Sequence, residues 1–198
     1  MALILASGSA TRARLLRDSG IVFDVVKPNV DEDEIKISYR AGGADVADAA
    51  LALAELKAQA ASRRASPGDF VLGSDQMLDC EGDWFDKPAD RNGAREQLRA
   101  LRGRAHHLVT SAYLMKDGAR IWHHVERAEL TMRDFSDAFL DQYLDQAGDA
   151  VLSSVGAYHL EGLGAQLFSR VRGDFFTILG LPLLPVLAIL REHGMVPS

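Results

Sequence analysis

Two short apolar runs place the strongest constraint on how this chain folds. Leu3-Ile4-Leu5-Ala6 and Phe70-Val71-Leu72-Gly73 lack the alternation of a strand with one solvated face. Each is therefore predicted to be a strand buried on both faces. A Gly/Ser turn and a helix ending near Gly20 follow the first run, and an Ala/Leu-rich helix over about 45–64 precedes the second. Buried strands that alternate with helices are typical of an α/β fold.

Longer strands are predicted later in the chain. Residues 107–115 and 121–132 have strand character and are separated by a turn at Asp117-Gly118. Such a pair is antiparallel, so the chain is expected to form an α/β fold with a mixed sheet rather than a purely doubly wound one. The other expected elements are a strand over 21–26, helices over 91–101, 136–146 and 183–191, and a second hairpin over 167–171 and 175–178.

Composition excludes several classes of protein. The length of 198 residues suffices for one substantial core, with or without a small lobe. The net charge of −6 argues against a general nucleic-acid binder, which normally has a basic excess. No apolar run approaches the roughly 20 residues of a membrane helix, and the N-terminal run lacks the basic region of a signal peptide. The single cysteine, Cys80, cannot form an internal disulfide and has acidic neighbours, which favours a cytoplasmic protein with a non-catalytic thiol.

The turn Ser7-Gly8-Ser9-Ala10-Thr11-Arg12 is the first candidate for a ligand site. A buried strand, a tight turn and a helix start together present free backbone N–H groups, which bind phosphate with help from the helix dipole. Ser7 and Ser9 can add hydroxyl donors, and Arg12 can add a charged fork. The turn is not a Walker P-loop. Alternatively, Ser9 only caps the helix and Arg12 is a solvated side chain.

Carboxylates supply the second candidate. The acidic run Asp31-Glu32-Asp33-Glu34 shows no helical or strand periodicity, so it is expected to be a loop. Asp75 is predicted to lie just past the carboxyl end of the strand that begins at Phe70, where open α/β sheets place their ligands. Glu32 with Asp75 would suffice for Mg²⁺, which takes one or two carboxylates and substrate phosphates. A solvated loop and a turn-forming aspartate are the alternatives.

Two lysines are the third candidate. Lys57 falls on the same helical stripe as Val46, Ala50 and Leu53, where an unpaired ammonium is costly. A phosphate partner would remove that cost, although a lysine can also extend along its helix to water. Lys87, before Pro88, is by itself an ordinary surface residue.

Taken in order, these segments resemble the Maf-like family of nucleotide pyrophosphatases over almost the whole chain. The resemblance implies a single domain over 1–198 with a Maf/ITPase-like fold, in which a curved mixed sheet flanked by helices forms two lobes with a central cleft. The matching segments are Leu3 to Ser9 with Arg12 and Leu15-Leu16, Asp31-Glu32, Lys57-Ala58, Gly73 to Gln76, Lys87-Pro88, Gly156 to Tyr158 with Glu161-Gly162, and Gly173-Asp174 with Gly180 to Leu183.

By resemblance, the chain is expected to hydrolyse a nucleoside triphosphate between its α and β phosphates. Ser9 and Arg12 would hold phosphates, with Ser7 as the further substrate-binding donor that the turn itself indicates, and Lys57 and Lys87 would neutralise developing charge. Glu32 and Asp75 would bind a divalent cation, Mg²⁺ or Mn²⁺, with Asp75 activating water. These roles agree with the chemistry of phosphoryl transfer, which depends on positioning and on charge stabilisation.

Departures from the family pattern bear on the base. Ala10 and Thr11 stand where the family usually has proline and a first arginine. Gln76 and Glu161 resemble the branch that prefers 7-methyl-GTP rather than the branch that resembles dTTP/UTP pyrophosphatases. A carboxylate at Glu161 suits a purine that N7 methylation has made cationic, and it can accept from guanine N–H groups. A modified base such as 7-methyl-GTP is therefore expected, with Gln76 and Glu161 as substrate-binding residues.

Three alternatives remain at this point. The first is a dTTP/UTP pyrophosphatase, and the second is a non-catalytic nucleotide sensor that regulates cell division. The set Glu32, Lys57, Asp75 and Lys87 argues against the sensor, because a pure binder does not need a carboxylate to activate water. A nucleic-acid-binding module is disfavoured by the net charge. No nucleic-acid or membrane partner is expected. The resemblance is compatible with a homodimer, since dimers are common in the family, but the sequence does not determine the oligomeric state.

Overall fold

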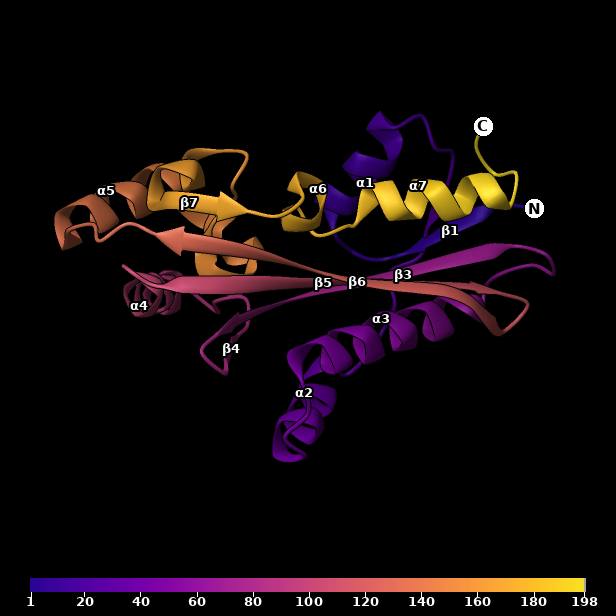
Figure 1. Ribbon diagram of the computed structural model, residues 1–198, viewed down its shortest axis with the longest axis horizontal. Coiled ribbons are helices and arrows are strands. Elements are labelled where there is room, and N and C mark those ends of the chain that lie inside the picture. Colours follow the sequence, from indigo (N-terminus) through magenta and orange to yellow (C-terminus); the bar gives the residue numbers. More distant parts are fainter. Residues whose placement is uncertain (198) are drawn as a thin grey trace. The chain divides into compact units, whose positions relative to one another are not determined.

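The computed structural model describes residues 1–197 as an α/β structure built on one mixed sheet (Figure 1). The strand order is β2-β1-β3-β5-β6-β7, and β4 pairs with β3. Strand β1 is parallel to β2 and β3, whereas the β3–β4 and β6–β7 pairs are antiparallel. The predicted mixed sheet is thereby confirmed.

The elements alternate along the first half of the chain and are followed by the long strands. The strands are β1 Leu3–Ala6, β2 Asp24–Val25, β3 Phe70–Cys80, β4 Asp83–Phe85, β5 Ala105–Lys116, β6 Ala119–Met132 and β7 Phe168–Arg172. The helices are α1 Ala10–Asp18, α2 Glu32–Ala41, α3 Val46–Ser62, α4 Arg91–Leu101, α5 Asp137–Ala147, α6 Phe175–Ile178 and α7 Leu183–Glu192, with 3-10 turns η1 Gly148–Ser153, η2 Val155–Ala157 and η3 Leu163–Leu167.

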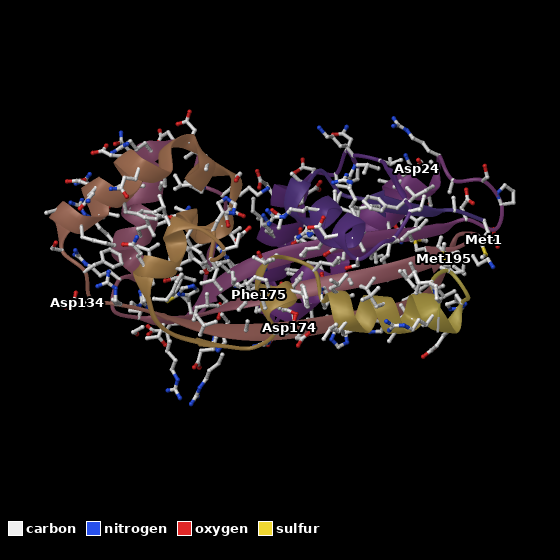
Figure 2. All side chains as sticks on the ribbon, turned by 90° about the horizontal axis from the view of Figure 1, so that it is seen from above. Met1, Asp24, Asp134, Asp174, Phe175 and Met195 are labelled. Atoms are coloured by element: carbon white, nitrogen blue, oxygen red, sulfur yellow. The ribbon has the colours of Figure 1, made fainter. Side chains whose placement is uncertain are left out.

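The chain forms two compact units. The first comprises Met1–Gln76, Thr110–Glu126 and the chain from Phe175 onward, and the second comprises Met77–Val109 and Arg127–Asp174. Asp174 and Phe175, which Figure 2 labels, mark the last passage from the second unit into the first. Strands β3, β5 and β6 contribute residues to both units.

In the first unit, both faces of β1 are buried, as its unbroken apolar sequence predicts. Leu3 and Leu5 pack into one cluster with residues of α1 and α7, whereas Ile4 and Ala6 pack into another with alanines of α3. Figure 1 shows α1 and α7 on one side of these strands and α3 on the other. Helix α3 is well suited to its position, because its inward alanines allow close approach to the sheet and Asp45 caps its first turn.

In the second unit, ion pairs link helices α4 and α5, and aromatic side chains are buried inside. Arginines of α4 pair with aspartates of α5 at four-residue spacing, which aligns the pairs on one face of each helix. The pairs are Arg91–Asp145, Arg95–Asp141 and Arg99–Asp137. Inside the unit, His106 Nε2 lies 2.7 Å from the Tyr158 hydroxyl. Burial lowers the pKa of His106 to about 4, so its ring is neutral near pH 7.

Two predicted strands differ from the structure in the first unit. The strand expected over 21–26 shrinks to Asp24–Val25, the residues that pair with the short β1. Strand β3 does not end before Asp75 but continues to Cys80, so Asp75 lies within the strand. The polar residues Ser74, Asp75 and Gln76 resembled a strand end in the sequence. They remain in the strand because partners elsewhere in the first unit bond to their side chains.

Two other predictions were wrong about element type. The acidic run expected to be a loop begins α2: Asp31 is its N-cap, accepting from the Glu34 backbone N–H, and the acidic first turn suits the positive end of the helix dipole. Residues 175–178, expected to be the second strand of a hairpin with 167–171, form helix α6, whereas β7 pairs with β6. Among residues 1–197, no helix combines the length and apolar character that crossing a membrane requires.

Candidate active site

The turn after β1 begins the site. Ser9 is the N-cap of α1: its hydroxyl accepts from the backbone N–H of Arg12 at 3.3 Å. The Ser7 hydroxyl accepts from the backbone N–H of Ser9 at 3.1 Å. The capping role considered for Ser9 is thus present, and it leaves the N–H groups of Ala10 and Thr11 at the helix start as donors for an anion.

Arg12 is a buried cation rather than a solvated one. Its side chain is 9% exposed. Its Nε donates to the Gly180 carbonyl at 2.6 Å and its Nη1 to the Ser7 hydroxyl at 3.2 Å. Burial lowers the pKa of Arg12, and the nearby charges of Asp75 and Glu32 oppose that effect. Two of the five guanidinium N–H donors are used by these bonds, so the fork keeps donors for an anionic ligand.

The absence of a side chain at Gly73 brings helix α3 against strand β3. A Cβ there would lie 2.1 Å from the Ala54 carbonyl oxygen and 2.9 Å from the Ala58 nitrogen, both backbone atoms of α3. Gly73 and Asp75 share one face of the strand, because side chains alternate with a period of two. The close approach therefore places Lys57, one residue before Ala58, beside Asp75.

Lys57 bridges two carboxylates. Its Nζ lies 2.6 Å from Asp75 Oδ1 and 2.7 Å from Glu32 Oε1. Lys57 and Asp75 are 7% and 4% exposed, whereas the Glu32 side chain is 40% exposed. Asp75 Oδ2 is buried and has no hydrogen-bond partner. A buried acceptor without a partner is costly, and a cation or a water molecule would satisfy it.

Backbone carbonyls near α6 hold three site residues in place, and the sequence analysis missed this role. The Gln76 Nε2 donates to the carbonyls of Thr177 and Ile178 at 3.0 and 3.1 Å, and to the Thr110 hydroxyl at 2.9 Å. The Ser74 hydroxyl donates to the Gly180 carbonyl, which also accepts from Arg12. The Gly-Leu-Pro segment was visible in the sequence, but nothing in it indicated that its carbonyls point at Arg12.

Two predicted site residues belong to the second unit. Lys87 follows β4, and its side chain is exposed. Glu161 lies in the turn before η3 and is also exposed. The first unit brings together the remaining predicted residues, which are Ser7, Ser9, Arg12, Glu32, Lys57, Asp75 and Gln76.

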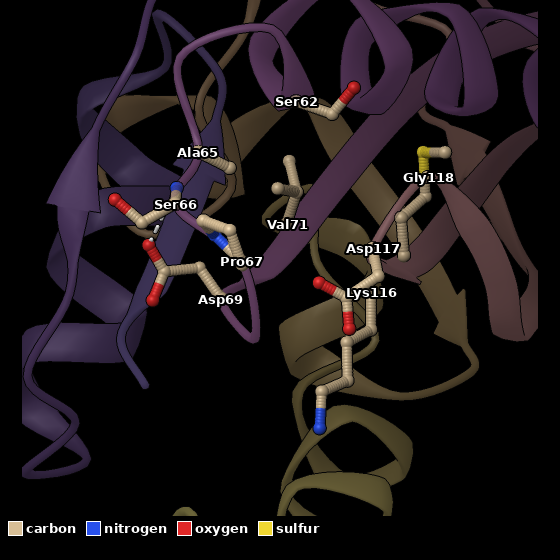
Figure 3. Close-up of a pocket in the computed structure, with 10 residues that line it drawn as sticks. Ser62, Ala65, Ser66, Pro67, Asp69, Val71, Lys116, Asp117 and Gly118 are labelled. Atoms are coloured by element: carbon tan, nitrogen blue, oxygen red, sulfur yellow. Dashed lines mark hydrogen bonds between the residues drawn. The ribbon is translucent and has the colours of Figure 1, made fainter.

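A separate pocket of about 340 Å³ lies at the beginning of β3 (Figure 3). Asp69 and Asp117 line it together with Lys116. Both carboxylates are engaged: Asp69 accepts from the backbone N–H groups of Ala2 and Ser66, and Asp117 accepts from that of Gly68. These bonds fix the surrounding loops, so the pocket offers no unsatisfied buried carboxylate comparable to Asp75.

The donor set near Lys57 fits a divalent cation whose other ligands are substrate phosphates and water. Among residues 1–197, no group of three or more His, Cys, Asp and Glu side chains is arranged to hold a metal. Asp75 and Glu32 supply two carboxylates, and Asp75 Oδ2 is a free oxygen. Mg²⁺ is commonly bound by one or two carboxylates, with substrate phosphates and water completing the octahedron.

Comparison with known proteins places this chain among relatives along its whole length. The "Nucleoside triphosphate pyrophosphatase" of Paramagnetospirillum magneticum is 58% identical over 98% of this chain and 100% of its own. The "7-methyl-GTP pyrophosphatase" of Rhizobium meliloti is 45% identical over 99% and 98%. The crystal structure of a nucleoside-triphosphatase / dITP/XTP pyrophosphatase from Mycobacterium abscessus aligns over 100% of this chain and 98% of its own, with 14% identity and a TM-score of 0.45. The model of the Maf-like protein family matches residues 2–193. The chain belongs to the Maf-like family.

Proposed function

We propose that this chain hydrolyses nucleoside triphosphates to the monophosphate and pyrophosphate, with Asp75 and its partners in the first unit as the reactive centre. One observation carries the proposal: a buried carboxylate holds a lysine through one oxygen and leaves the other oxygen unsatisfied. The names of the relatives in Paramagnetospirillum magneticum and Rhizobium meliloti support the same reaction. The enzyme is therefore a hydrolase that acts on a phosphoanhydride bond.

Arg12, Lys57 and Asp75 each have a role that their positions support. Arg12 and the N–H groups at the start of α1 bind phosphate oxygens, and the Gly180 carbonyl and the Ser7 hydroxyl orient the Arg12 fork. Lys57 stabilises the charge that develops on phosphate oxygens as the α–β bridge breaks. Asp75 accepts the proton that the attacking water loses. By the family pattern, Lys87 also contributes a positive charge that neutralises developing charge on the phosphates.

A divalent cation completes this proposal. Asp75 and Glu32 are the residues that would hold it, and their oxygens fit the preference of Mg²⁺ or Mn²⁺ for carboxylates. When bound, such a cation neutralises phosphate charge and lowers the pKa of coordinated water. The chain itself supplies the proton acceptor, the phosphate donors and the burial that strengthens these interactions.

A 7-methylated guanine nucleotide is the proposed substrate. Gln76 supports this assignment because its Nε2 is committed to three acceptors, which leaves its carbonyl oxygen as the group that can face a ligand. Glu161 is exposed and acidic, and a carboxylate attracts a purine that carries a positive charge. The name of the Rhizobium meliloti relative agrees, whereas the relative at 58% identity has only the general name.

The test is a panel of triphosphates with Mg²⁺ or Mn²⁺, scored by pyrophosphate release. We expect 7-methyl-GTP to be cleaved with a higher kcat/KM than GTP, dTTP or UTP, and Glu161→Gln to reduce that preference. Asp149→Asn removes an exposed carboxylate of the same unit and should leave the preference unchanged. Faster turnover of dTTP or UTP would reject the base assignment while leaving the reaction type in place.

A further inference from the structure

We propose that Lys57 occupies the divalent-cation site of the nucleotide-free enzyme, so that the cation enters together with the nucleotide rather than before it. The inference rests on the proposed function and adds an order of binding to it. In this arrangement Lys57 holds Asp75 and Glu32 together until phosphate oxygens offer its ammonium another partner.

The geometry of the bridge is the first support. Lys57 Nζ lies 2.6 Å from Asp75 Oδ1 and 2.7 Å from Glu32 Oε1. A cation that coordinates these same two oxygens, Asp75 Oδ1 and Glu32 Oε1, would lie roughly 2.1 Å from each, in the space that the ammonium now fills. Two positive charges at such a separation repel strongly, above all beside a carboxylate that is 4% exposed. Lys57 must therefore withdraw before Asp75 Oδ1 and Glu32 Oε1 can both bind the cation.

Charge balance is the second support. The cluster contains two carboxylates, Asp75 and Glu32, and two cations, Arg12 and Lys57. Lys36 adds a third positive charge 3.9 Å from Glu32. A cluster without excess negative charge has little electrostatic attraction for a further dication. A bound triphosphate adds several negative charges and shifts the balance toward cation uptake.

The lysine side chain suits such an exchange. Its ammonium is a point charge on a flexible stem, so it can move from a carboxylate to a phosphate oxygen without the fixed geometry that a guanidinium fork requires. Arg12, in contrast, is fixed by the Gly180 carbonyl and the Ser7 hydroxyl. The cluster thus combines one anchored cation with one that can move. Asp75 Oδ2, which has no partner, is the oxygen from which the exchange can begin.

The experiment measures Mn²⁺ binding to nucleotide-free protein at pH 8 by electron paramagnetic resonance. We expect the wild-type protein to bind Mn²⁺ weakly, and Lys57→Met to lower the Kd by about tenfold or more, since removing a competing occupant raises apparent affinity. The polar, uncharged variant Lys57→Gln should behave in the same way. Lys57→Arg keeps the positive charge and should bind Mn²⁺ as weakly as the wild type.

Lys36→Met is the matched control. Lys36 lies 3.9 Å from the other oxygen of Glu32, so this variant removes a positive charge next to the same carboxylate without touching Asp75. Its Kd should stay within about twofold of the wild type, as expected for a long, partly exposed i,i+4 pair. A cluster that simply attracts cations more strongly after any loss of positive charge would respond equally to both substitutions, and that result would overturn the proposal.

Two further outcomes decide the question. Unchanged or weaker Mn²⁺ binding in both Lys57→Met and Lys57→Gln, with circular dichroism showing folded protein, would overturn the exchange. Tight binding to the nucleotide-free wild type would do the same. Tighter Mn²⁺ binding only in Lys57→Met and Lys57→Gln supports the exchange. Neither Mn²⁺ binding nor circular dichroism depends on turnover. A lack of pyrophosphatase activity would therefore reject the proposed function without deciding the exchange.

Discussion

Asp69 and Asp75 lie six residues apart in the first unit, and their carboxylate oxygens differ in their hydrogen-bond partners. Asp69 directly precedes β3, and both of its oxygens accept from backbone N–H groups, those of Ala2 and Ser66. These bonds lower the pKa of Asp69. Asp75, inside β3, has a lysine on one oxygen and no partner on the other. The first carboxylate fixes loops, whereas the second keeps bonding capacity that the fold itself does not use.

This difference has an energetic meaning. A buried acceptor without a partner costs about 1–3 kcal/mol, so an arrangement like that of Asp75 lowers stability unless a ligand satisfies it. Asp69 has no such cost. The contrast supports the proposal that Asp75 serves a ligand, whereas the bonds of Asp69 serve the fold.

The largest expected effect comes from replacing each aspartate by asparagine. Asp75→Asn removes the proposed proton acceptor, and we expect kcat for pyrophosphate release to fall by about a thousandfold or more. Asp69→Asn should change kcat by less than about twofold, because its bonds serve only loops. Steady-state kinetics on the two variants measures the difference directly. Similar losses in both would remove the distinction between the two carboxylates.

The next effect tests the fixed cation near Asp75. Arg12→Lys keeps the charge but loses the fork that bonds Gly180 and Ser7, and we expect kcat/KM to fall about a hundredfold. Arg17→Lys is the control, since Arg17 is exposed on the same helix and its guanidinium carbon lies 6.0 Å from the centre of the Phe23 ring. Equal kcat/KM values for the two variants would show that the fork does not matter.

A smaller effect is expected from the contact that brings α3 to the strand. Gly73→Ala places a Cβ against the backbone of Ala54 and Ala58, so α3 must shift and Lys57 must move away from Asp75. We expect a loss of about 1–3 kcal/mol in the free energy of unfolding, and a roughly tenfold lower kcat. Urea unfolding and kinetics measure both.

Gly42→Ala is the control for that substitution. A Cβ on Gly42 would meet only carbonyl oxygens at 3.5 and 3.6 Å, and its φ of −79° suits any residue. Stability and turnover should stay close to the wild type. If Gly73→Ala were equally silent, the close approach of α3 would not be what positions Lys57.

The smallest expected effect is the pH dependence of the stability that Asp69 contributes. The pKa of Asp69 is lower in the folded protein than its unfolded value of 3.8. The charged carboxylate therefore stabilises the folded protein at pH values above 3.8. This stabilisation is lost as the pH falls from 3.8 through the pKa of the folded state. The difference in Tm between wild type and Asp69→Asn should therefore shrink as pH falls from 6 toward roughly 3. A constant difference in calorimetric scans would show that the charge of Asp69 contributes nothing.

Local signals in the sequence predicted much of the fold. Helix α4 begins after the cap Asp90 and ends before Gly103, as its capping residue and glycine indicate. The buried run at β1 and the Asp117-Gly118 turn also predicted the observed structure. Residues 175–178 misled the prediction, because their aromatic and β-branched side chains favour a strand. Here tertiary contacts decide: Thr177 is buried, and its carbonyl accepts from Gln76 and Thr110.

The candidate site was predictable by residue type but not by its contacts. The sequence indicated that Lys57 faces inward, and the structure places it on Asp75 and Glu32. Asp75 was predicted to lie past a strand end, because polar residues rarely sit inside buried strands. It lies within β3 because Lys57, 18 residues away, pairs with it. The anchoring of Arg12 by Gly180 spans 168 residues, which no local pattern reveals.

The most direct test of the account is the identity of the products. Purified wild-type protein with 7-methyl-GTP and Mg²⁺ should yield the nucleoside monophosphate and pyrophosphate in equal amounts, as followed by ³¹P NMR. Release of orthophosphate with a nucleoside diphosphate, or no cleavage of any triphosphate in the panel, would contradict the assignment of this site to pyrophosphate release.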